Sequence, residues 1–114
     1  MRLTTEFWVS ALVRRVFKDG GFAAVLRRGS DSAGAIFIMS RDRLGTVSLF
    51  GPAPQTGYDS ARPDDRMFVL LAQTDDQASI DERLSREQRF DPDLWLVEIE
   101  PADAQAELFP VMTP

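Results

Sequence analysis

Residues 94–100 read Leu-Trp-Leu-Val-Glu-Ile-Glu. Successive side chains of an extended chain alternate between two faces, so Trp95, Val97 and Ile99 fall on one face. Glu98 and Glu100 fall on the other face. This pattern predicts a β-strand with one buried side. The neighbour of this strand determines the topology of the sheet. If it lies beside the first strand, the sheet is fully antiparallel. If it lies beside the fourth strand, the two form a parallel pair.

The residues before this strand predict a helix over about 75–89. Thr74 followed by Gln77 resembles a capping box, and Ile80 and Leu84 supply an apolar stripe one turn apart. The turn Asp91-Pro92-Asp93 ends the helix, because proline disfavours helical backbone in the residue before it.

Four further strands are predicted upstream, over residues 22–28, 35–41, 46–50 and 66–73. We expect the first three to form an antiparallel meander, with a hairpin loop at Gly29–Gly34. That loop has the G-x-x-x-x-G spacing of a phosphate loop. Ala35-Ile36 follows it instead of Lys-Ser/Thr, so a hairpin turn is the favoured interpretation.

Residues 4–19 predict the first helix. Trp8, Leu12 and Val16 recur at helical spacing, and the opposite face is polar. Gly20-Gly21 follows at once and suits a left-handed helix end.

The element order α-β-β-β-β-α-β predicts an α+β two-layer sandwich, a mostly antiparallel sheet of about five strands with both helices on one face. We expect one domain over residues 1–114. Residues 51–65 form a long connection rich in Pro and Gly, and residues 101–114 form an acidic, then apolar tail that packs loosely.

The 114 residues include no His and no Cys. This removes the commonest general base, the thiolate nucleophile and the usual zinc ligands. We therefore expect no enzymatic activity, no cofactor and no metal site. No targeting segment and no apolar run of roughly 18 residues is found, which favours the cytoplasm and no membrane partner.

The net charge of −5 argues against nucleic-acid binding. The charge is unevenly spread, because residues 1–50 carry eight basic and four acidic side chains, while residues 51–114 carry five and fourteen. Such asymmetry marks either an interaction surface or two halves that pair within one fold.

Two stretches carry a family resemblance: Phe22–Gly29, with Asp31 and Gly34-Ala35 after it, and Arg86–Glu100. The most specific motif is Arg89–Trp95. Together with Trp8, Arg14-Arg15 and Gly51–Pro54, these stretches resemble domain-of-unknown-function family 1491, which is mainly alphaproteobacterial. The resemblance implies a small cytoplasmic protein without an assigned activity, and it transfers no functional residue.

The densest mixture of charged and aromatic side chains is Arg89-Phe-Asp-Pro-Asp-Leu-Trp95. If the last strand pairs with the first, this motif lies near two arginines. The candidate binding residues are therefore Arg27, Arg28, Arg89, Asp91, Asp93 and Trp95. The alternative is that the same residues only anchor helix and strand to the core.

Glu98 and Glu100 are a second candidate pair, about 6.5 Å apart by strand rise. Two carboxylates at that separation suit acid–base work or a hard cation. A solvated strand face is the favoured interpretation.

The expected function is a non-enzymatic protein-interaction module that binds another protein. The alternative is a small-ligand or anion-binding protein that uses the Arg/Asp site. The oligomeric state is left open.

Overall fold

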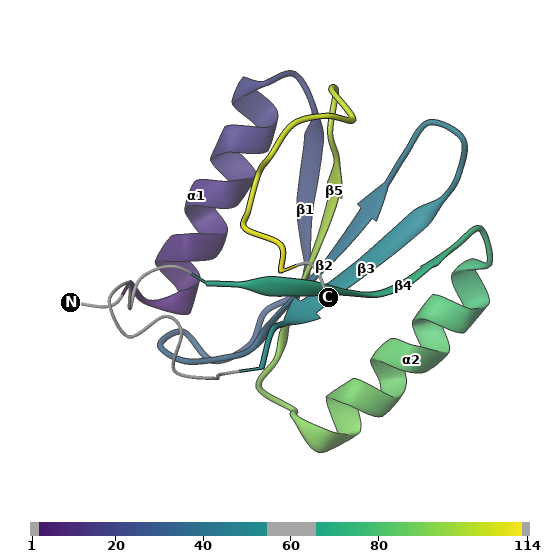
Figure 1. Ribbon diagram of the computed structural model, residues 1–114. Helices are drawn as coiled ribbons and strands as arrows, with labels where there is room; N and C mark the ends of the chain where they lie inside the picture. The colour runs from purple at the N-terminus through teal and green to yellow at the C-terminus, as the bar shows by residue number, and fades with distance from the viewer. Residues whose placement is uncertain (1–2, 55–65, 113–114) are drawn as a thin grey trace.

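A computed structural model describes residues 3–54 and 66–112. Its elements are α1 (Thr5–Lys18), β1 (Phe22–Arg27), β2 (Ile36–Arg41), β3 (Val47–Pro52), β4 (Phe68–Thr74), α2 (Gln77–Phe90) and β5 (Trp95–Glu100) (Figure 1). The predicted α+β class and element order are confirmed. Gly51 and Pro52 belong to β3, and residues 55–65 of the predicted loop lie outside the described residues.

The five strands form one sheet in the order β1-β5-β2-β3-β4. β5 pairs antiparallel with β1, as one of the two predicted placements requires, and parallel with β2. The sheet is therefore not fully antiparallel, and placement beside the fourth strand is wrong. The predicted hairpin between the first two strands is also wrong, because β5 lies between them. The meander consists of β2, β3 and β4.

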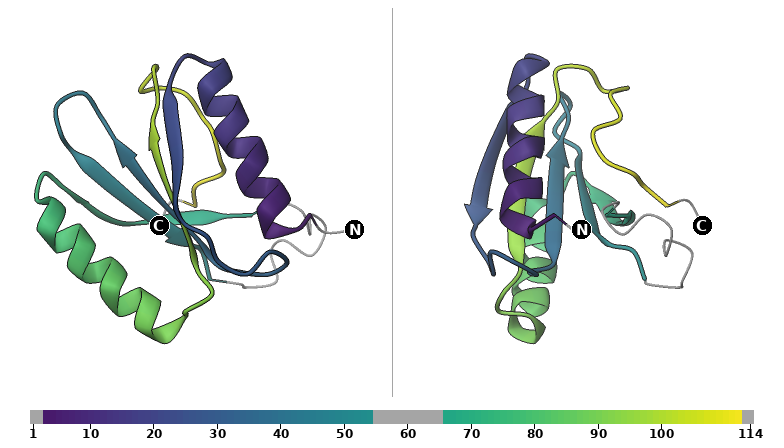
Figure 2. Two further views of the ribbon diagram at one scale, coloured as in Figure 1. Left: turned by 180° about the vertical axis from the view of Figure 1, so that it is seen from behind. Right: turned by 90° about the vertical axis from the view of Figure 1, so that its left-hand side faces the viewer.

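The two helices cover opposite faces of the sheet, so the prediction that they share one face is wrong (Figures 1 and 2). Ile36 and Ile38 of β2 pack in the same cluster as α1, whereas Phe37 and Met39 pack in the cluster of α2. The physical reason is the composition of β2. A strand with apolar residues at four successive positions needs cover on both faces.

Side chains next to each helix fix where it begins. Thr4 caps α1 by accepting a hydrogen bond from the backbone N–H of Phe7 at 3.2 Å. Asp76 caps α2 by accepting from Ala78 at 3.1 Å. The predicted capping role of Thr74 is wrong, because its hydroxyl accepts from the N–H of Asp76, the residue immediately before the helix, and from no N–H within the helix.

The C-terminal segment, residues 101–112, returns across the α1 face to β4 (Figure 2). Leu108 is buried, and the Phe109 ring lies 5.2 Å from Phe50 and 5.1 Å from Phe68, centroid to centroid. The backbone of Phe68 donates to Pro110 at 3.0 Å and accepts from Met112 at 2.7 Å. The chain thus pairs the beginning of its own β4 edge.

If the C-terminal segment holds the core together, Leu108→Ala lowers the free energy of unfolding by about 2 kcal/mol or more. Leu44→Ala, at a position 91% exposed in the β2–β3 turn, changes it by less than about 0.5 kcal/mol. Urea denaturation measures both. Equal effects for the two variants would show that the segment does not contribute to the core.

Candidate functional site

The connection between β1 and β2, residues 28–35, crosses over the beginning of β5; we call it the β1–β2 crossing. A Cβ atom on Gly29 would lie 1.9 Å from the carbonyl oxygen of Asp93. One on Gly34 would lie 2.4 Å from the same oxygen and 2.8 Å from the Trp95 ring. Close approach to β5 therefore requires both glycines, and neither a hairpin turn nor a phosphate loop is needed to explain them.

Hydrogen bonds hold the crossing on both sides. The backbone N–H of Ser30 donates to Asp93 at 3.0 Å, and the indole N–H of Trp95 donates to the Ser30 carbonyl at 2.7 Å. From α1, the hydroxyl of the fully buried Thr5 donates to the Gly34 carbonyl at 3.1 Å. The crossing thus joins the first helix to the last strand.

Two predicted site residues, Arg27 at the end of β1 and Arg28 in the crossing, lie beside the beginning of β5. The guanidinium of Arg27 donates to the carbonyl of Pro92. Arg28 forms ion pairs with Glu6 and, at 3.2 Å, with Asp31. Its guanidinium carbon also lies 5.0 Å from the centroid of the Trp95 ring. Both arginines are thus engaged by the protein itself.

The other predicted residues lie close by in the chain. Asp91 ends α2, and its carboxylate accepts from the N–H of Asp93 at 3.1 Å. Trp95 is buried. Arg89 is exposed in the last turn of α2 and makes none of the contacts of the crossing. The structure thus brings Arg27, Arg28, Asp93 and Trp95 to one place and leaves Arg89 on the surface.

The two carboxylates of the second predicted pair, Glu98 and Glu100, lie in different surroundings. Glu98, 17% exposed, forms an ion pair with Arg41 at 3.2 Å, and Arg41 also donates to Gln77 at 2.6 Å. Glu100 is exposed at the end of β5. Over residues 3–54 and 66–112, no cluster of three or more acidic side chains is placed to hold a metal ion.

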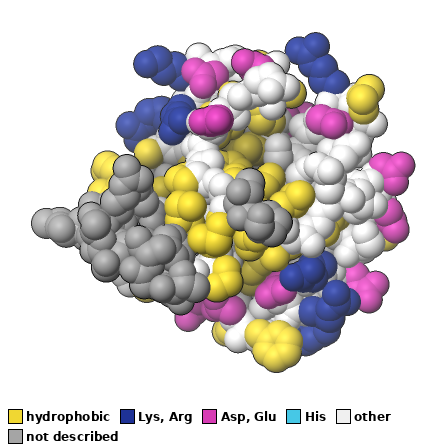
Figure 3. All heavy atoms as spheres, in the orientation of Figure 1, with side chains coloured by type: hydrophobic (Ala, Val, Ile, Leu, Met, Phe, Trp, Pro, Cys, Tyr) yellow, Lys and Arg dark blue, Asp and Glu magenta, His cyan; other side chains and the backbone are white. Residues whose placement is uncertain are grey.

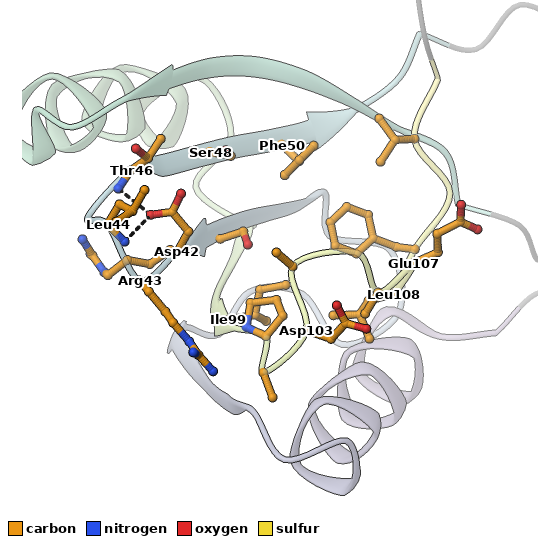
Figure 4. Close-up of a pocket in the computed structure, with 18 of the residues that line it drawn as sticks. Asp42, Arg43, Leu44, Thr46, Ser48, Phe50, Ile99, Asp103, Glu107 and Leu108 are labelled. Carbon is orange, nitrogen blue, oxygen red and sulfur yellow. Dashed lines mark hydrogen bonds between the residues drawn. The ribbon is translucent and has the colours of Figure 1, made fainter.

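A pocket of about 940 Å³ opens on the α1 face, between the β2–β3 turn and the C-terminal segment (Figure 4). We call it the α1-face pocket. Ser40, Ser48 and Ile99 line it from the sheet, and Leu108 and Phe109 line it from the C-terminal segment. None of the six predicted site residues lines it.

The most exposed apolar strand is β1, at the sheet edge. Phe22 is 47% exposed, Val25 42% and Leu26 51%. The ring of Phe17, half exposed on α1, lies 5.9 Å from the Phe22 ring. We call these four residues the β1 edge patch.

Sequence reasoning missed both the pocket and the patch. The sequence contained a signal for the patch: Phe22, Val25 and Leu26 are apolar at both odd and even positions of the strand, and one helix covers only one of its two faces. The pocket had a weaker signal: Ser40 and Ser48 interrupt the apolar pattern of central strands. Neither signal identifies a site until the neighbours of each strand are known.

Comparisons with known proteins bear on the whole fold. The family model described as "Protein of unknown function (DUF1491)" matches residues 3–109. The chain belongs to the DUF1491 family. No protein of curated function matches it.

Solved structures resemble this DUF1491 protein over its full length. A protein from A. tumefaciens, solved in solution, is 45% identical, with coverage of 100% of this chain and 98% of that chain and a TM-score of 0.84. A DUF1491 family protein from Caulobacter crescentus, in its crystal structure, is 34% identical, with coverage of 99% and 100% and a TM-score of 0.79. An NMR structure of a DUF1491 family protein from Caulobacter crescentus is 34% identical with a TM-score of 0.79, and 99% of each chain is covered.

Within the described parts of this DUF1491 protein, neither helix is long and apolar enough to cross a bilayer.

Gly29→Ala tests the crossing. Because the new methyl group would collide with the Asp93 carbonyl, we expect the free energy of unfolding to fall by about 3 kcal/mol. The control is Gly45→Ala, where φ is +88° but no atom lies within 4 Å of the new carbon, and it costs about 1 kcal/mol. Urea denaturation compares the two. A Gly29 variant no less stable than the Gly45 variant contradicts the close approach.

Proposed function

We propose that this DUF1491 protein is a non-enzymatic protein-interaction module that binds an extended segment of another protein along the free edge of β1. The proposal keeps the cytoplasmic location expected from the sequence. The observation that supports it most is that one edge of the sheet is partly paired and the other is not. β4 is paired at Phe68 by the C-terminal segment, whereas β5 alone pairs with β1 among the described strands.

An unpaired edge strand presents a row of backbone N–H and C=O groups that can pair with a second chain. Natural proteins usually block such an edge with charges, prolines or very short strands. β1 reads Phe-Ala-Ala-Val-Leu-Arg, with its one charge at the last position. The protective features are the charge of Arg27 and the register shift between Val25 and Arg27, both at the end of the strand. This composition favours strand addition by a partner.

The side chains of the β1 edge patch support the same surface. Large apolar side chains that are half exposed together mark interaction sites more often than scattered ones do. Aromatic residues are also enriched at interface centres, and the patch holds the Phe17–Phe22 pair. An incoming strand would therefore gain backbone hydrogen bonds and apolar contacts together.

The Arg/Asp ligand site has less support as an alternative. The guanidiniums of Arg27 and Arg28 already bind Pro92, Glu6 and Asp31. A ligand would have to displace these contacts, which hold the crossing. The sequence also lacks His and Cys, so a catalytic role there would depend on carboxylates and arginines alone.

Leu26→Lys tests the proposal in an affinity pull-down at native expression level, read by mass spectrometry. A lysine on the edge strand opposes strand addition, so we expect a stoichiometric partner to be reduced at least about tenfold. Leu70→Lys is the matched control, because Leu70 is 44% exposed on the other edge strand. It should retain the partner.

Circular dichroism first establishes that both variants fold. A partner that is retained by Leu26→Lys, or lost equally with Leu70→Lys, contradicts binding along β1. Light scattering identifies a second copy of the chain as the partner if the mass doubles.

A further inference from the structure

The α1-face pocket raises a question separate from the β1 edge, because the sheet changes character beneath it. On the α1 face, β2 presents Ile36 and Ile38 and then Ser40. On the same face, β3 presents Ser48 and then Phe50. The floor thus changes from apolar to hydroxyl-bearing towards the β2–β3 turn, beyond the cluster buried under α1.

Serine and threonine are uncommon in an apolar core, because burying a hydroxyl group without a hydrogen-bond partner costs free energy. Ser48 accepts a hydrogen bond from Gln73 at 2.9 Å, and Thr46 adds a third hydroxyl to the lining. The other half of the lining is apolar, from Phe50, Ile99 and residues 108–109. An occupant that fits this division has an apolar body and a polar head.

The wall formed by the C-terminal segment is fixed in place. Arg15 of α1 donates to the backbone carbonyl of Glu107 at 2.7 Å, and Leu108 is buried in the α1 cluster. The Phe109 ring packs against two other phenylalanine rings. A pocket of about 940 Å³ is within the range of small-molecule sites, roughly 300–1,000 Å³.

The charge of the head follows from the side chains around the opening. Carboxylates come from different sides of it in Figure 4, from residues Asp42, Asp103 and Glu107. Two arginines also line the pocket, but Arg41 is paired with Glu98, which lies outside the lining. Arg43 remains beside three carboxylates, of which Asp42 already accepts from the backbone N–H groups of Leu44 and Thr46 and Asp103 from that of Gln105, each at 2.9 Å. Figure 3 shows this face with hydrophobic side chains in the middle and both acidic and basic side chains near its upper margin.

We propose that the α1-face pocket binds a small amphipathic amine, with its apolar chain over Phe50 and Ile99 and its ammonium group towards the carboxylates of Asp103 and Glu107. An ammonium donates three hydrogen bonds and accepts none, which suits carboxylate and hydroxyl oxygens. Glu107 is exposed and lines the pocket, and the hydrogen bond from Arg15 goes to its backbone carbonyl.

NMR titration of the isotope-labelled protein tests this with three probes of one chain length: n-octylamine, 1-octanol and octanoate. The amine is protonated at neutral pH. We expect it to shift amides of residues 40–50 and 99–111 and to bind about tenfold more tightly than octanoate, because a charged hydrogen bond replaces a repulsion. The alcohol should lie between them.

The double variant Asp103→Asn, Glu107→Gln should reduce the preference for the amine to less than about threefold. The matched control, Asp75→Asn with Glu82→Gln, removes two exposed carboxylates outside the pocket and should keep the preference. Ala106→Phe fills the pocket and should weaken all three probes.

Equal binding of amine and octanoate overturns the proposal, as do shifts confined to residues outside the pocket or no shift with any probe. If the double variant does not fold, the wild-type comparison of the three probes still decides, since both its selectivity and its location are predicted.

Discussion

The close approach of Gly29 and Gly34 to the Asp93 carbonyl is the constraint on which the rest of the structure depends. It allows the chain to pass over β5, so that β5 inserts between β1 and β2. Trp95 fixes the crossing by a hydrogen bond to Ser30 and by its ring beneath Arg28. Four of the six residues that the sequence indicated as a binding site, Arg27, Arg28, Asp93 and Trp95, are therefore residues that hold this passage in place.

Two properties of the surface follow from the strand order and from the placement of the helices. The first is that β1 becomes an edge strand, with an apolar sequence and an outer side that no described strand covers. The second is that α1 and α2 cover opposite faces, so each face is only partly covered by its helix. On the α1 face the C-terminal segment completes the cover and leaves the α1-face pocket beside it.

The elements themselves could be predicted from the sequence because they depend on local patterns. Helical spacing of Leu12 and Val16 and the alternation of Val97 and Ile99 are such patterns. Strand order depends on long-range contacts, and the six-residue loop Gly29–Gly34 suits a hairpin as well as a crossing. One local signal was available and overlooked: the four apolar residues that begin β2 predict cover on both faces. The position of Arg27 near the start of β5 was predicted, but its use of a backbone carbonyl was not.

β1 is the strand that we propose receives a partner. Amide hydrogen exchange on the protein alone and with its captured partner tests it most directly, since exchange reports each backbone N–H separately. We expect new protection at the amides of residues 22–27 that do not pair with β5, and unchanged exchange in β4. New protection confined to β4 or to the α1-face pocket, with β1 unchanged, would contradict it.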